Sequence, residues 1–345
     1  MDRALGCLDD LPRARLGHTP TPLEAMTNLA GHIGGGPLYV KRDDCTGLAL
    51  GGNKVRQLEF YLGEAQAGQA DTILITGAVQ SNFARLAAAA ARKLGMDCHI
   101  QHEERVAEPG PAYRESGNVL LEKMLGATLH AYPSGEDEEG ADGRLGEIAA
   151  ALRDSGQRPY VIHLAPGHPP LGALGYVDAA RELVGQMTAQ DLTFDEIVVA
   201  SGSGHTHGGL LFGLRALGCK VPVTGICVRR DAEAQRPRLI ARCREIAELL
   251  GIPSPVEDGD IRLDDRYLAP GYGRLNEPTV EAIEMAARFE ALILDPVYTG
   301  KTMAGFLTRA RDDTGGNKAL LFIHTGGSPA VFGYGPTLAD AMLHD

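Results

Sequence analysis

The sequence has no block of lysine and arginine residues. Its 33 basic residues are outnumbered by 45 acidic ones, which gives a formal net charge of −12. An acidic protein without a basic block repels polyphosphates and anionic lipids. No stretch approaches the roughly 18–20 apolar residues that a membrane-spanning helix requires. These absences argue against nucleic acid and membrane as partners, and they predict that any bound anion is held by local groups.

The sequence also lacks cysteine pairs of the C-x-x-C type. Its six cysteines are scattered over the chain, at Cys7, Cys45, Cys98, Cys219, Cys227 and Cys243. In a chain of this length, scattered cysteines indicate free thiols in a reducing compartment. The first twenty residues mix Asp, Arg and Pro without an apolar run, so we expect no secretory signal. A cytoplasmic protein is the simplest expectation.

No low-complexity tract and no short repeat interrupts the 345 residues, of which 44% are apolar and 23% are charged. This composition is near the globular average, and the length suits two hydrophobic cores. Short runs rich in Val and Ile predict strands at residues 38–41, 72–76, 98–101, 128–131, 160–163, 196–200, 221–228 and 319–323. Helices are predicted between them, at 54–66, 82–94, 117–125, 143–154, 174–187, 206–217, 231–250 and 279–289. Strands that alternate with helices predict an α/β fold with mainly parallel sheets.

Two loops mark the organisation of the chain. The acidic, turn-rich segment 133–140 is expected on the surface. The segment 165–170 has too little helix or strand propensity for a regular element, and we place a crossing between two domains there. In open parallel sheets, ligands bind where the carboxyl ends of strands meet helix N-termini, usually at a domain cleft. The loops that follow strands are therefore the candidate sites.

One such loop places a lysine at the start of a predicted helix, in Gly51-Gly52-Asn53-Lys54. The positive end of the helix dipole disfavours the charged form of that lysine. A lysine whose ammonium is disfavoured readily forms a Schiff base. The alternative interpretation is a solvated lysine, and this loop alone leaves both open.

Two further loops join a strand to a helix. In the first, Ser81 and Asn82 fit a helix N-cap, and the backbone N–H groups of the same turn suit a carboxylate. In the second, residues 201–209, small side chains let backbone N–H groups converge on a phosphate. This loop nearly matches a dinucleotide fingerprint, but His207 replaces its last glycine and the next strand ends in Arg229-Arg230 rather than an acid. A single phosphate fits better, and an NADP-binding oxidoreductase is the rival interpretation.

Two other patterns are set aside. The segment 298–302 resembles the end of a Walker A loop, but Asp295 stands where its first glycine belongs. A metal site is suggested by four histidines, His163, His168, His205 and His207. No carboxylate accompanies them at a ligand spacing, so we predict no metal. The turn His324-Thr325-Gly326-Gly327 is uninformative by itself.

Together and in this order, the loops resemble the family of D-cysteine desulfhydrases, L-cysteate sulfo-lyases and 1-aminocyclopropane-1-carboxylate deaminases. The resemblance runs from about Leu16 to about Tyr334. Its marks are Thr21-Pro22-Leu23, Lys41-Arg42-Asp43-Asp44, Gly51-Gly52-Asn53-Lys54, Gln80-Ser81-Asn82, Leu171-Gly172-Ala173-Leu174-Gly175-Tyr176, Pro270-Gly271-Tyr272-Gly273, Asp295-Pro296-Val297-Tyr298 and His324-Thr325-Gly326-Gly327.

The resemblance implies a tryptophan-synthase-β-like architecture of fold type II, in which two α/β domains hold pyridoxal 5'-phosphate in their cleft. It implies a large cofactor-binding domain of residues 1–54 and 165–345 and a small domain of residues 55–164. It also implies a homodimer that acts on a small amino acid.

The resemblance further implies roles for individual residues. Lys54 would carry the cofactor covalently and move the proton at Cα. Asn53, Asn82 and Thr325 would contact the cofactor, with Asn82 at its phenolic oxygen and Thr325 at its pyridine nitrogen. The substrate carboxylate would bind Ser81 and Asn82, and Tyr272 and Tyr298 would take part on the substrate side. The cofactor phosphate would bind the turn formed by Gly202, Ser203, Gly204, His205 and Thr206.

Two positions favour β-elimination. Ring-opening deaminases of the resembled family carry a glutamate after the tyrosine, where this chain has Thr299, and a leucine where it has Thr325. A hydroxyl at the pyridine nitrogen keeps that nitrogen mostly unprotonated, and this weaker electron sink suits loss of a good leaving group. We therefore expect a carbon–sulfur lyase that converts an amino acid such as D-cysteine or L-cysteate to pyruvate and ammonia. The alternatives are a cyclopropane-ring deaminase and a non-catalytic carrier of the cofactor.

Three departures from the family pattern concern the substrate. Phe83 follows Ser81-Asn82 where a polar residue is usual, His205 replaces a small residue in the phosphate turn, and the loop around His168 lacks the usual Gly-Ser-Asn/Asp element. We expect these three residues around the substrate end of the cleft, with both histidines supplying a switchable positive charge. The alternative for Phe83 is packing beneath its own helix.

Overall fold

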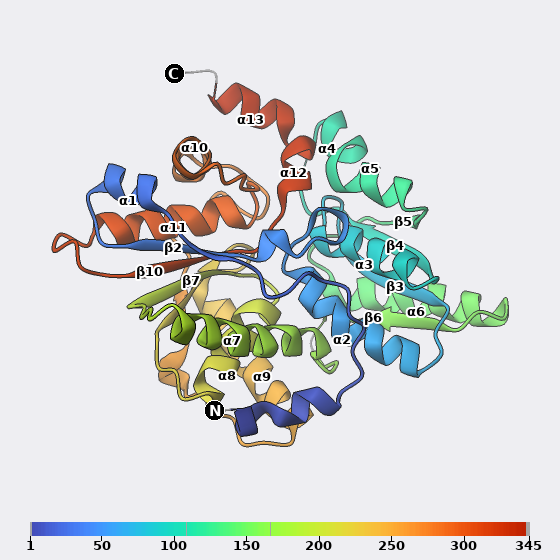
Figure 1. Cartoon of the computed structure of the whole chain (residues 1–345). Coiled ribbons are helices and arrows are strands. Elements are labelled where there is room, and N and C mark those ends of the chain that lie inside the picture. The colour runs from blue at the N-terminus through green and yellow to red at the C-terminus, as the bar shows by residue number, and fades with distance from the viewer. Residues whose placement is uncertain (1, 108, 166, 343–345) are drawn as a thin grey trace.

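The computed structural model describes residues 2–107, 109–165 and 167–342. Pro166, in the loop where we expected the domain crossing, lies outside the described residues. So do Met1 and residues 343–345, at the two ends of the predicted large domain. Helices and strands alternate along the described chain and build two sheets that lie side by side (Figure 1).

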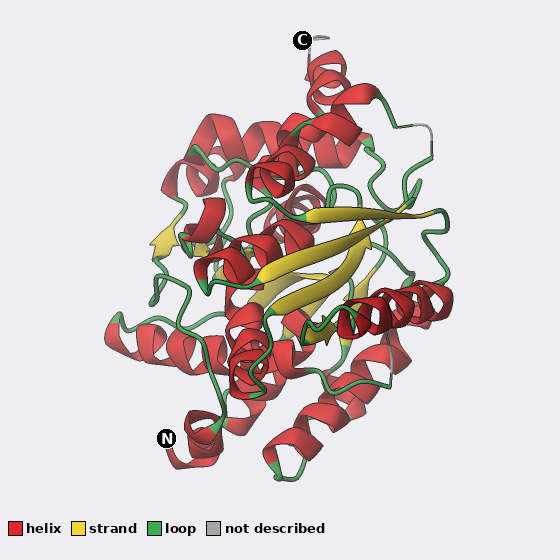
Figure 2. Ribbon diagram, turned by 90° about the vertical axis from the view of Figure 1, so that its right-hand side faces the viewer, coloured by secondary structure: helices red, strands yellow, loops and turns green. Residues whose placement is uncertain are grey.

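The larger sheet has six strands in the order β1-β2-β10-β7-β8-β9, and all neighbours are parallel except β1 and β2. Helices cover both of its faces (Figure 2). The strands are β1 (Leu23–Ala25), β2 (Leu38–Arg42), β7 (Glu196–Ser201), β8 (Val223–Cys227), β9 (Arg262–Asp264) and β10 (Leu320–His324). The helices that accompany it are α1 (Thr27–Ile33), α7 (Leu171–Ala189), α8 (His205–Ala216), α9 (Ala232–Leu250), α10 (Glu277–Glu290), α11 (Thr299–Arg311), α12 (Ser328–Gly333) and α13 (Gly335–Met342).

The smaller sheet has four parallel strands in the order β5-β4-β3-β6. These strands are β3 (Thr72–Ala78), β4 (Asp97–Glu103), β5 (Thr128–Tyr132) and β6 (Pro159–Ile162). Its helices are α2 (Lys54–Ala67), α3 (Asn82–Lys93), α4 (Pro111–Glu115), α5 (Gly117–Met124) and α6 (Glu138–Asp154). Strand β3 is buried along its whole length, as a parallel strand covered by helices on both faces must be.

The predicted α/β fold with two mainly parallel sheets is confirmed, and all eight predicted strands are present. The sequence analysis missed β1 and β9, which have three residues each and lie at the two edges of the larger sheet. It also missed α1, α4, α12 and α13, and α11, which begins within the segment that resembles a Walker A loop. None of the helices in the described part of the chain is long and apolar enough to cross a membrane.

The prediction that the acidic segment 133–140 is a surface loop holds in part. Residues 133–137 form a loop in which Pro133, Glu136 and Asp137 are exposed, whereas α6 begins at Glu138, with Asp137 as N-cap accepting from the Gly140 N–H. The Glu138 carboxylate turns inward because Arg229, Arg230 and Arg238 all contact it. Sequence periodicity could not show this, because Arg229 and Arg230 follow β8 of the larger sheet and Arg238 lies on α9.

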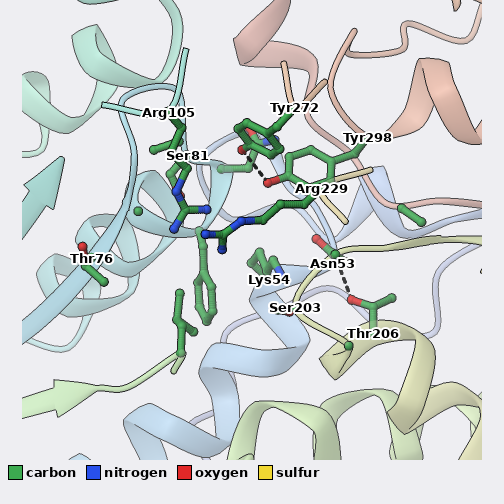
Figure 3. A pocket seen from close by; sticks show the side chains of 18 of the residues that line it. Asn53, Lys54, Thr76, Ser81, Arg105, Ser203, Thr206, Arg229, Tyr272 and Tyr298 are labelled. Carbon is green, nitrogen blue, oxygen red and sulfur yellow. Dashed lines mark hydrogen bonds between the residues drawn. The ribbon is translucent and has the colours of Figure 1, made fainter. Parts of the chain in front are cut away.

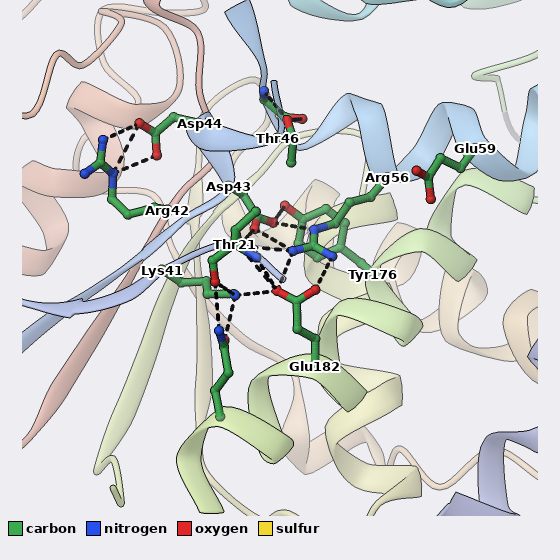
Figure 4. Close-up of polar contacts among 12 residues, drawn as sticks. Thr21, Lys41, Arg42, Asp43, Asp44, Thr46, Arg56, Glu59, Tyr176 and Glu182 are labelled. Carbon is green, nitrogen blue, oxygen red and sulfur yellow. Dashed lines mark hydrogen bonds and ion pairs between the residues drawn. The ribbon is translucent and has the colours of Figure 1, made fainter. Parts of the chain in front are cut away.

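A buried ion network fastens α2 to the larger sheet and to α7 (Figure 4). The Arg56 guanidinium donates to Asp43 at 2.9 and 3.1 Å and to Glu182 at 2.8 and 2.9 Å. Lys41 on β2 also binds Glu182, and the Tyr176 hydroxyl donates to Asp43 at 2.6 Å. Burial opposes the charge on Asp43, yet Arg56 and Lys41 hold the pKa of its carboxyl below the ordinary value. Two cations and two carboxylates thus neutralise one another inside the protein.

We predict that Arg56→Met lowers the free energy of unfolding by about 3–5 kcal/mol, because it leaves one cation, Lys41, for two buried carboxylates. Chemical denaturation followed by circular dichroism measures the change. The control is Arg114→Gln, whose ion pair with Glu104 is exposed and should contribute less than about 1 kcal/mol. Equal losses in the two variants would contradict the prediction.

Candidate functional site

A pocket lies where the carboxyl ends of strands from both sheets meet the first turns of α2, α3 and α8 (Figure 3). The predicted site residues that line it are Asn53, Lys54, Ser81, Asn82, Phe83, Gly202, Ser203, Gly204, Thr206, Tyr272, Tyr298 and Thr325. The charged residues that line it without having been predicted are Glu103, Arg105, Glu138, Asp142, Arg229, Arg238 and Asp295. His168 and His205 are not among the lining residues.

Lys54 is the first residue of α2, and its side chain faces the pocket. The side chain keeps some exposure to the pocket, but protein atoms surround its amine, and this burial lowers the pKa of Lys54 to about 8. The amine lies 3.2 Å from the Gln57 amide oxygen and 4.9 Å from the centre of the Phe83 ring. We expected a lowered pKa from the helix dipole, whereas burial is its cause here. At pH values above about 8 the amine is mostly neutral and can act as a nucleophile or a base.

The predicted phosphate turn forms the N-terminus of α8. Gly204, with φ of 90°, precedes the helix and offers no capping side chain, so the first N–H groups face the pocket unsatisfied by a cap. No carboxylate lies in the first turn of α8. The Thr206 oxygen accepts from the side-chain amides of Asn53 at 2.8 Å and Gln57 at 2.9 Å. Both of its acceptor positions are then filled, so its hydroxyl proton remains free to donate. Such a turn suits a phosphate.

The two histidines of this turn are buried behind it. Burial, with Arg242, Lys54 and Arg238 nearby, holds the pKa of His205 well below its ordinary value. Burial also lowers the pKa of His207 to about 4. The expectation that His205 supplies a switchable positive charge is therefore wrong, because the imidazole is neutral at physiological pH.

The start of α3 forms a second set of donors. The Ser81 oxygen caps the helix by accepting from the Ala84 N–H at 3.1 Å. A Cβ on Gly77 would lie 2.7 Å from that oxygen, so only glycine leaves room for the cap. The Asn82 side-chain oxygen accepts from Asn118 at 2.9 Å, which leaves the Asn82 amide N–H groups to donate.

Arg85, on the same helix, holds the loop that leads to Lys54. Its guanidinium donates to the carbonyls of Ala49 and Gly51 and, at 2.9 Å, to Asn118. Ala49 and Leu50 have positive φ values of 40° and 70°, a backbone conformation that residues other than glycine rarely adopt. The buried arginine thus stabilises a strained turn beside the lysine.

Two tyrosines form the wall opposite α3. Their hydroxyls are 2.8 Å apart, and burial raises the pKa of both Tyr272 and Tyr298. Tyr298 is held in place by Asp295, whose carboxylate accepts from the backbone N–H groups of Val297, Tyr298 and Thr299. Because one hydroxyl donates to the other, one proton of the pair is left for a ligand.

Phe83 has both a pocket-facing position and a place in the core. It lines the pocket and it also packs in the buried cluster of the smaller sheet, where only 4% of it is exposed. His168 lies farther out and binds Asp142 at 3.1 Å.

No carboxylate stands at a ligand spacing from the histidines in the sequence, but α6 brings Asp142 to His163 and His168 in space. Their three potential ligand atoms lie within 4.8 Å of one another. The two rings, however, are stacked 3.7 Å apart at an interplanar angle of 4°. A metal ion lies close to the plane of each imidazole that binds it, and no point lies in two parallel planes. The arrangement suits a proton shared with Asp142 better than a metal.

Comparison with known proteins gives consistent matches. A family model described as "Pyridoxal-phosphate dependent enzyme" matches residues 14–326. The chain is 42% identical to a D-cysteine desulfhydrase of Yersinia enterocolitica over 334 residues, which cover 95% of this chain and 98% of that protein. It is 40% identical to a D-cysteine desulfhydrase of Salmonella choleraesuis, with the same coverage. A crystal structure of an "ACC deaminase homologue" aligns with a TM-score of 0.87 and 36% identity, over 99% of this chain and 100% of that one.

Independently of these comparisons, features of the pocket itself fit pyridoxal phosphate. An amine with a pKa of about 8 and an uncapped helix N-terminus line the same cavity. Gly52 allows the loop before Lys54 to approach Thr325 closely, since a Cβ on Gly52 would come within 3.2 Å of the Thr325 carbonyl oxygen. Thr325 itself lines the cavity, so its hydroxyl is available to a ring nitrogen.

We predict that the cofactor-free protein captures pyridoxal phosphate faster as pH rises, with half of the maximal rate near pH 8, because only the neutral Lys54 amine attacks the aldehyde. An ordinary lysine would place the midpoint near pH ~10.4. Absorbance after rapid mixing at each pH measures the rate, with Lys93→Ala as a surface control. A midpoint close to that of free lysine would show that the burial has no such effect.

We also predict that Thr206→Val weakens retention of the cofactor by roughly tenfold or more, since it removes a hydroxyl that donates to a charged phosphate. Equilibrium dialysis gives the dissociation constant. Thr188→Val, which removes a hydroxyl bound only to the Val184 carbonyl, should leave retention unchanged. Equal retention in both variants would exclude Thr206 from the phosphate site.

Proposed function

Because the chain belongs to the family of pyridoxal-phosphate-dependent enzymes, we propose that it uses Lys54 to eliminate the β-substituent of a small amino acid. The observation that carries the proposal is the placement of the Lys54 amine between the α8 N-terminus on one side and Ser81 on the other, within one pocket (Figure 3). The full-length likeness to two D-cysteine desulfhydrases supports the reaction class.

Bound pyridoxal phosphate supplies an electron sink for charge at Cα. In the proposed reaction, Ser81, Asn82 and the N-terminus of α3 bind the substrate carboxylate. The Lys54 amine removes the proton from Cα as a general base. The hydroxyl pair of Tyr272 and Tyr298 donates its free proton to the departing group. Substrate and one water then give pyruvate, ammonia and the leaving group, with no oxidant required.

Ring opening of a cyclopropane amino acid is the second candidate, since the solved "ACC deaminase homologue" shares the fold. The surroundings of Thr299 favour elimination. Its buried hydroxyl donates to Asp295 at 2.7 Å and accepts from the Asp295 N–H, and Thr299 does not line the pocket. The position after Tyr298 therefore offers no acid to a substrate.

The rival dinucleotide interpretation is less well supported. The end of β8, where an acid would bind the ribose, carries Arg229, whose guanidinium lines the pocket. We retain a single phosphate as the ligand of the α8 turn.

We further propose a cytoplasmic homodimer with the domain division given above. The two sheets support residues 1–54 with 165–345 and residues 55–164 as the domains, because each sheet draws its strands from one of these sets.

All six cysteines are unpaired, as in a reducing compartment. Leu120 and Met124 on α5 and Phe332 on α12 are exposed on helices that pack together, and a second copy could cover them. Sedimentation equilibrium tests the dimer.

The proposal predicts that the purified protein is yellow and releases pyruvate and ammonia from D-cysteine, L-cysteate or β-chloroalanine. Borohydride should fix the chromophore onto Lys54, and Lys54→Ala should reduce turnover by several orders of magnitude. The panel includes 1-aminocyclopropane-1-carboxylate, assayed for 2-oxobutanoate. Faster turnover of the cyclopropane acid than of every β-substituted amino acid would overturn β-elimination as the main activity. Colour without turnover of any substrate would indicate a carrier.

A further inference from the structure

A buried lysine that the proposed elimination does not use lies behind the two tyrosines. Lys301 stands in the first turn of α11, one turn after Tyr298, and it is buried. Its ammonium donates to two backbone carbonyls, that of Leu268 at 2.7 Å and that of Gly271 at 3.0 Å. No carboxylate among the described residues pairs with it, and burial lowers the pKa of Lys301 to about 8.

The two carbonyls belong to the loop that carries Tyr272. This loop, residues 265–276, joins β9 to α10 and contains no helix or strand. Gly271 and Gly273 have positive φ values of 145° and 65°, which favour glycine. Backbone hydrogen bonds inside the loop close only tight turns, such as that from the Gly271 N–H to the Leu268 carbonyl. The place of the loop relative to the sheets therefore depends on side chains that reach it from neighbouring elements.

Tyr298, by contrast, is fixed by its own helix. Its backbone N–H donates to Asp295 at 2.8 Å, and its carbonyl accepts from the Thr302 hydroxyl at 2.7 Å. The hydroxyls of Tyr272 and Tyr298 are 2.8 Å apart, a contact that is drawn in Figure 3. Because Lys301 belongs to the helix that Tyr298 begins, it ties the loop of one tyrosine to the element of the other.

Filling space does not explain a lysine at this position. An ammonium loses its hydration when it is buried, and an apolar side chain would occupy the same volume without that loss. What an apolar side chain cannot supply is a pair of hydrogen bonds from a charged donor, which are stronger and more directional than packing. The charge of Lys301 is therefore explained by the loop that it holds.

We propose that Lys301 is a positioning residue that keeps the Tyr272 hydroxyl against the Tyr298 hydroxyl. The inference rests on the proposed elimination, in which this pair donates a proton to the departing group, and it names the residue that sets the geometry of the pair. When the bond from the β-carbon breaks, its electron pair leaves with the departing atom. That atom takes the tyrosine proton, and the tyrosine pair afterwards regains a proton from water.

The leaving group decides how much this proton matters. Hydrosulfide, which cysteine loses, is a much stronger base than chloride, which β-chloroalanine loses. Proton donation therefore accelerates elimination from cysteine far more than elimination from β-chloroalanine. A residue that only stabilises the fold would affect both substrates alike, whereas a residue that positions the proton donor would not.

The test compares kcat/KM for cysteine and for β-chloroalanine of the same configuration, in the holoenzyme and its variants, with pyruvate as the product measured. Lys301→Met should lower the ratio of kcat/KM for cysteine to kcat/KM for β-chloroalanine by roughly 10- to 100-fold, which is part of what general acid catalysis contributes. The loss should fall on kcat more than on KM, because the carboxylate donors at the start of α3 are unchanged. Tyr272→Phe should lower the same ratio, and Lys301→Met should add little to it in the Tyr272→Phe background.

The matched control is Tyr267→Phe. The Tyr267 hydroxyl joins the same loop to α11 through Thr308, at 2.6 Å and farther along the helix from Tyr298. Its removal loosens the loop from the same helix without touching the tyrosine pair. The ratio should therefore stay unchanged in this variant.

A second variant reaches the same contact from the side of the loop. A Cβ on Gly271 has no atom within 4 Å, but a side chain at φ of 145° strains the backbone. Gly271→Ala should therefore displace the carbonyl that Lys301 binds, without crowding the core, and lower the ratio as Lys301→Met does.

An unchanged ratio in Lys301→Met, or in Gly271→Ala where Lys301→Met does not fold, would overturn the inference while the elimination stands. An unchanged ratio in Tyr272→Phe would overturn proton donation by the tyrosines and the inference with it. Failure of every β-substituted amino acid to yield pyruvate would overturn the proposed function itself, together with the role of Lys301.

Discussion

The position of Lys54 in the pocket depends on the ion network around Arg56. Arg56 stands two residues after Lys54 in the first turn of α2. It binds both Asp43, in the turn after β2, and Glu182 on α7. The first turn of the helix is therefore fixed against the larger sheet. Close packing assists this, because a Cβ on Gly175 would lie 2.2 Å from the Arg56 carbonyl oxygen. A charged network costs desolvation energy, but it defines one register of α2 against α7, which an apolar contact would define less sharply.

The chain has a net charge of −12, yet four of the residues that line its pocket are cationic. The structure arranges these charges locally. Asp43 and Glu182 neutralise their cations deep in the core, whereas Arg229, Arg230 and Arg238 all contact the Glu138 carboxylate, with Glu136 as a further partner of Arg229. Helix N-termini add partial positive charge at α3 and α8 without adding ionised groups. The charges around the pocket are thus set by these local groups and not by the overall charge of the chain.

The strands and most helices could be predicted from the sequence because hydrophobic periodicity and capping residues are local signals. Ser81 is an example, since its capping role follows from its place between strand and helix. Contacts between distant elements could not be predicted in that way. Nothing near Asp142 in the sequence points to His163, and nothing near Glu138 points to Arg238. In the sequence, Arg229-Arg230 stood out only because an acid is absent at the end of β8, and the fold was needed to show that Arg229 lines the same pocket as Arg105.

The buried Arg85 has a further consequence for the pocket. It ties α3, which carries Ser81, to the loop that precedes Lys54, while Arg56 ties the helix after that loop to the larger sheet. Lys54 and Ser81, which begin or cap different helices, are therefore positioned against each other by two buried arginines that do not line the pocket. A substitution of either arginine would change the pocket without touching a residue that lines it.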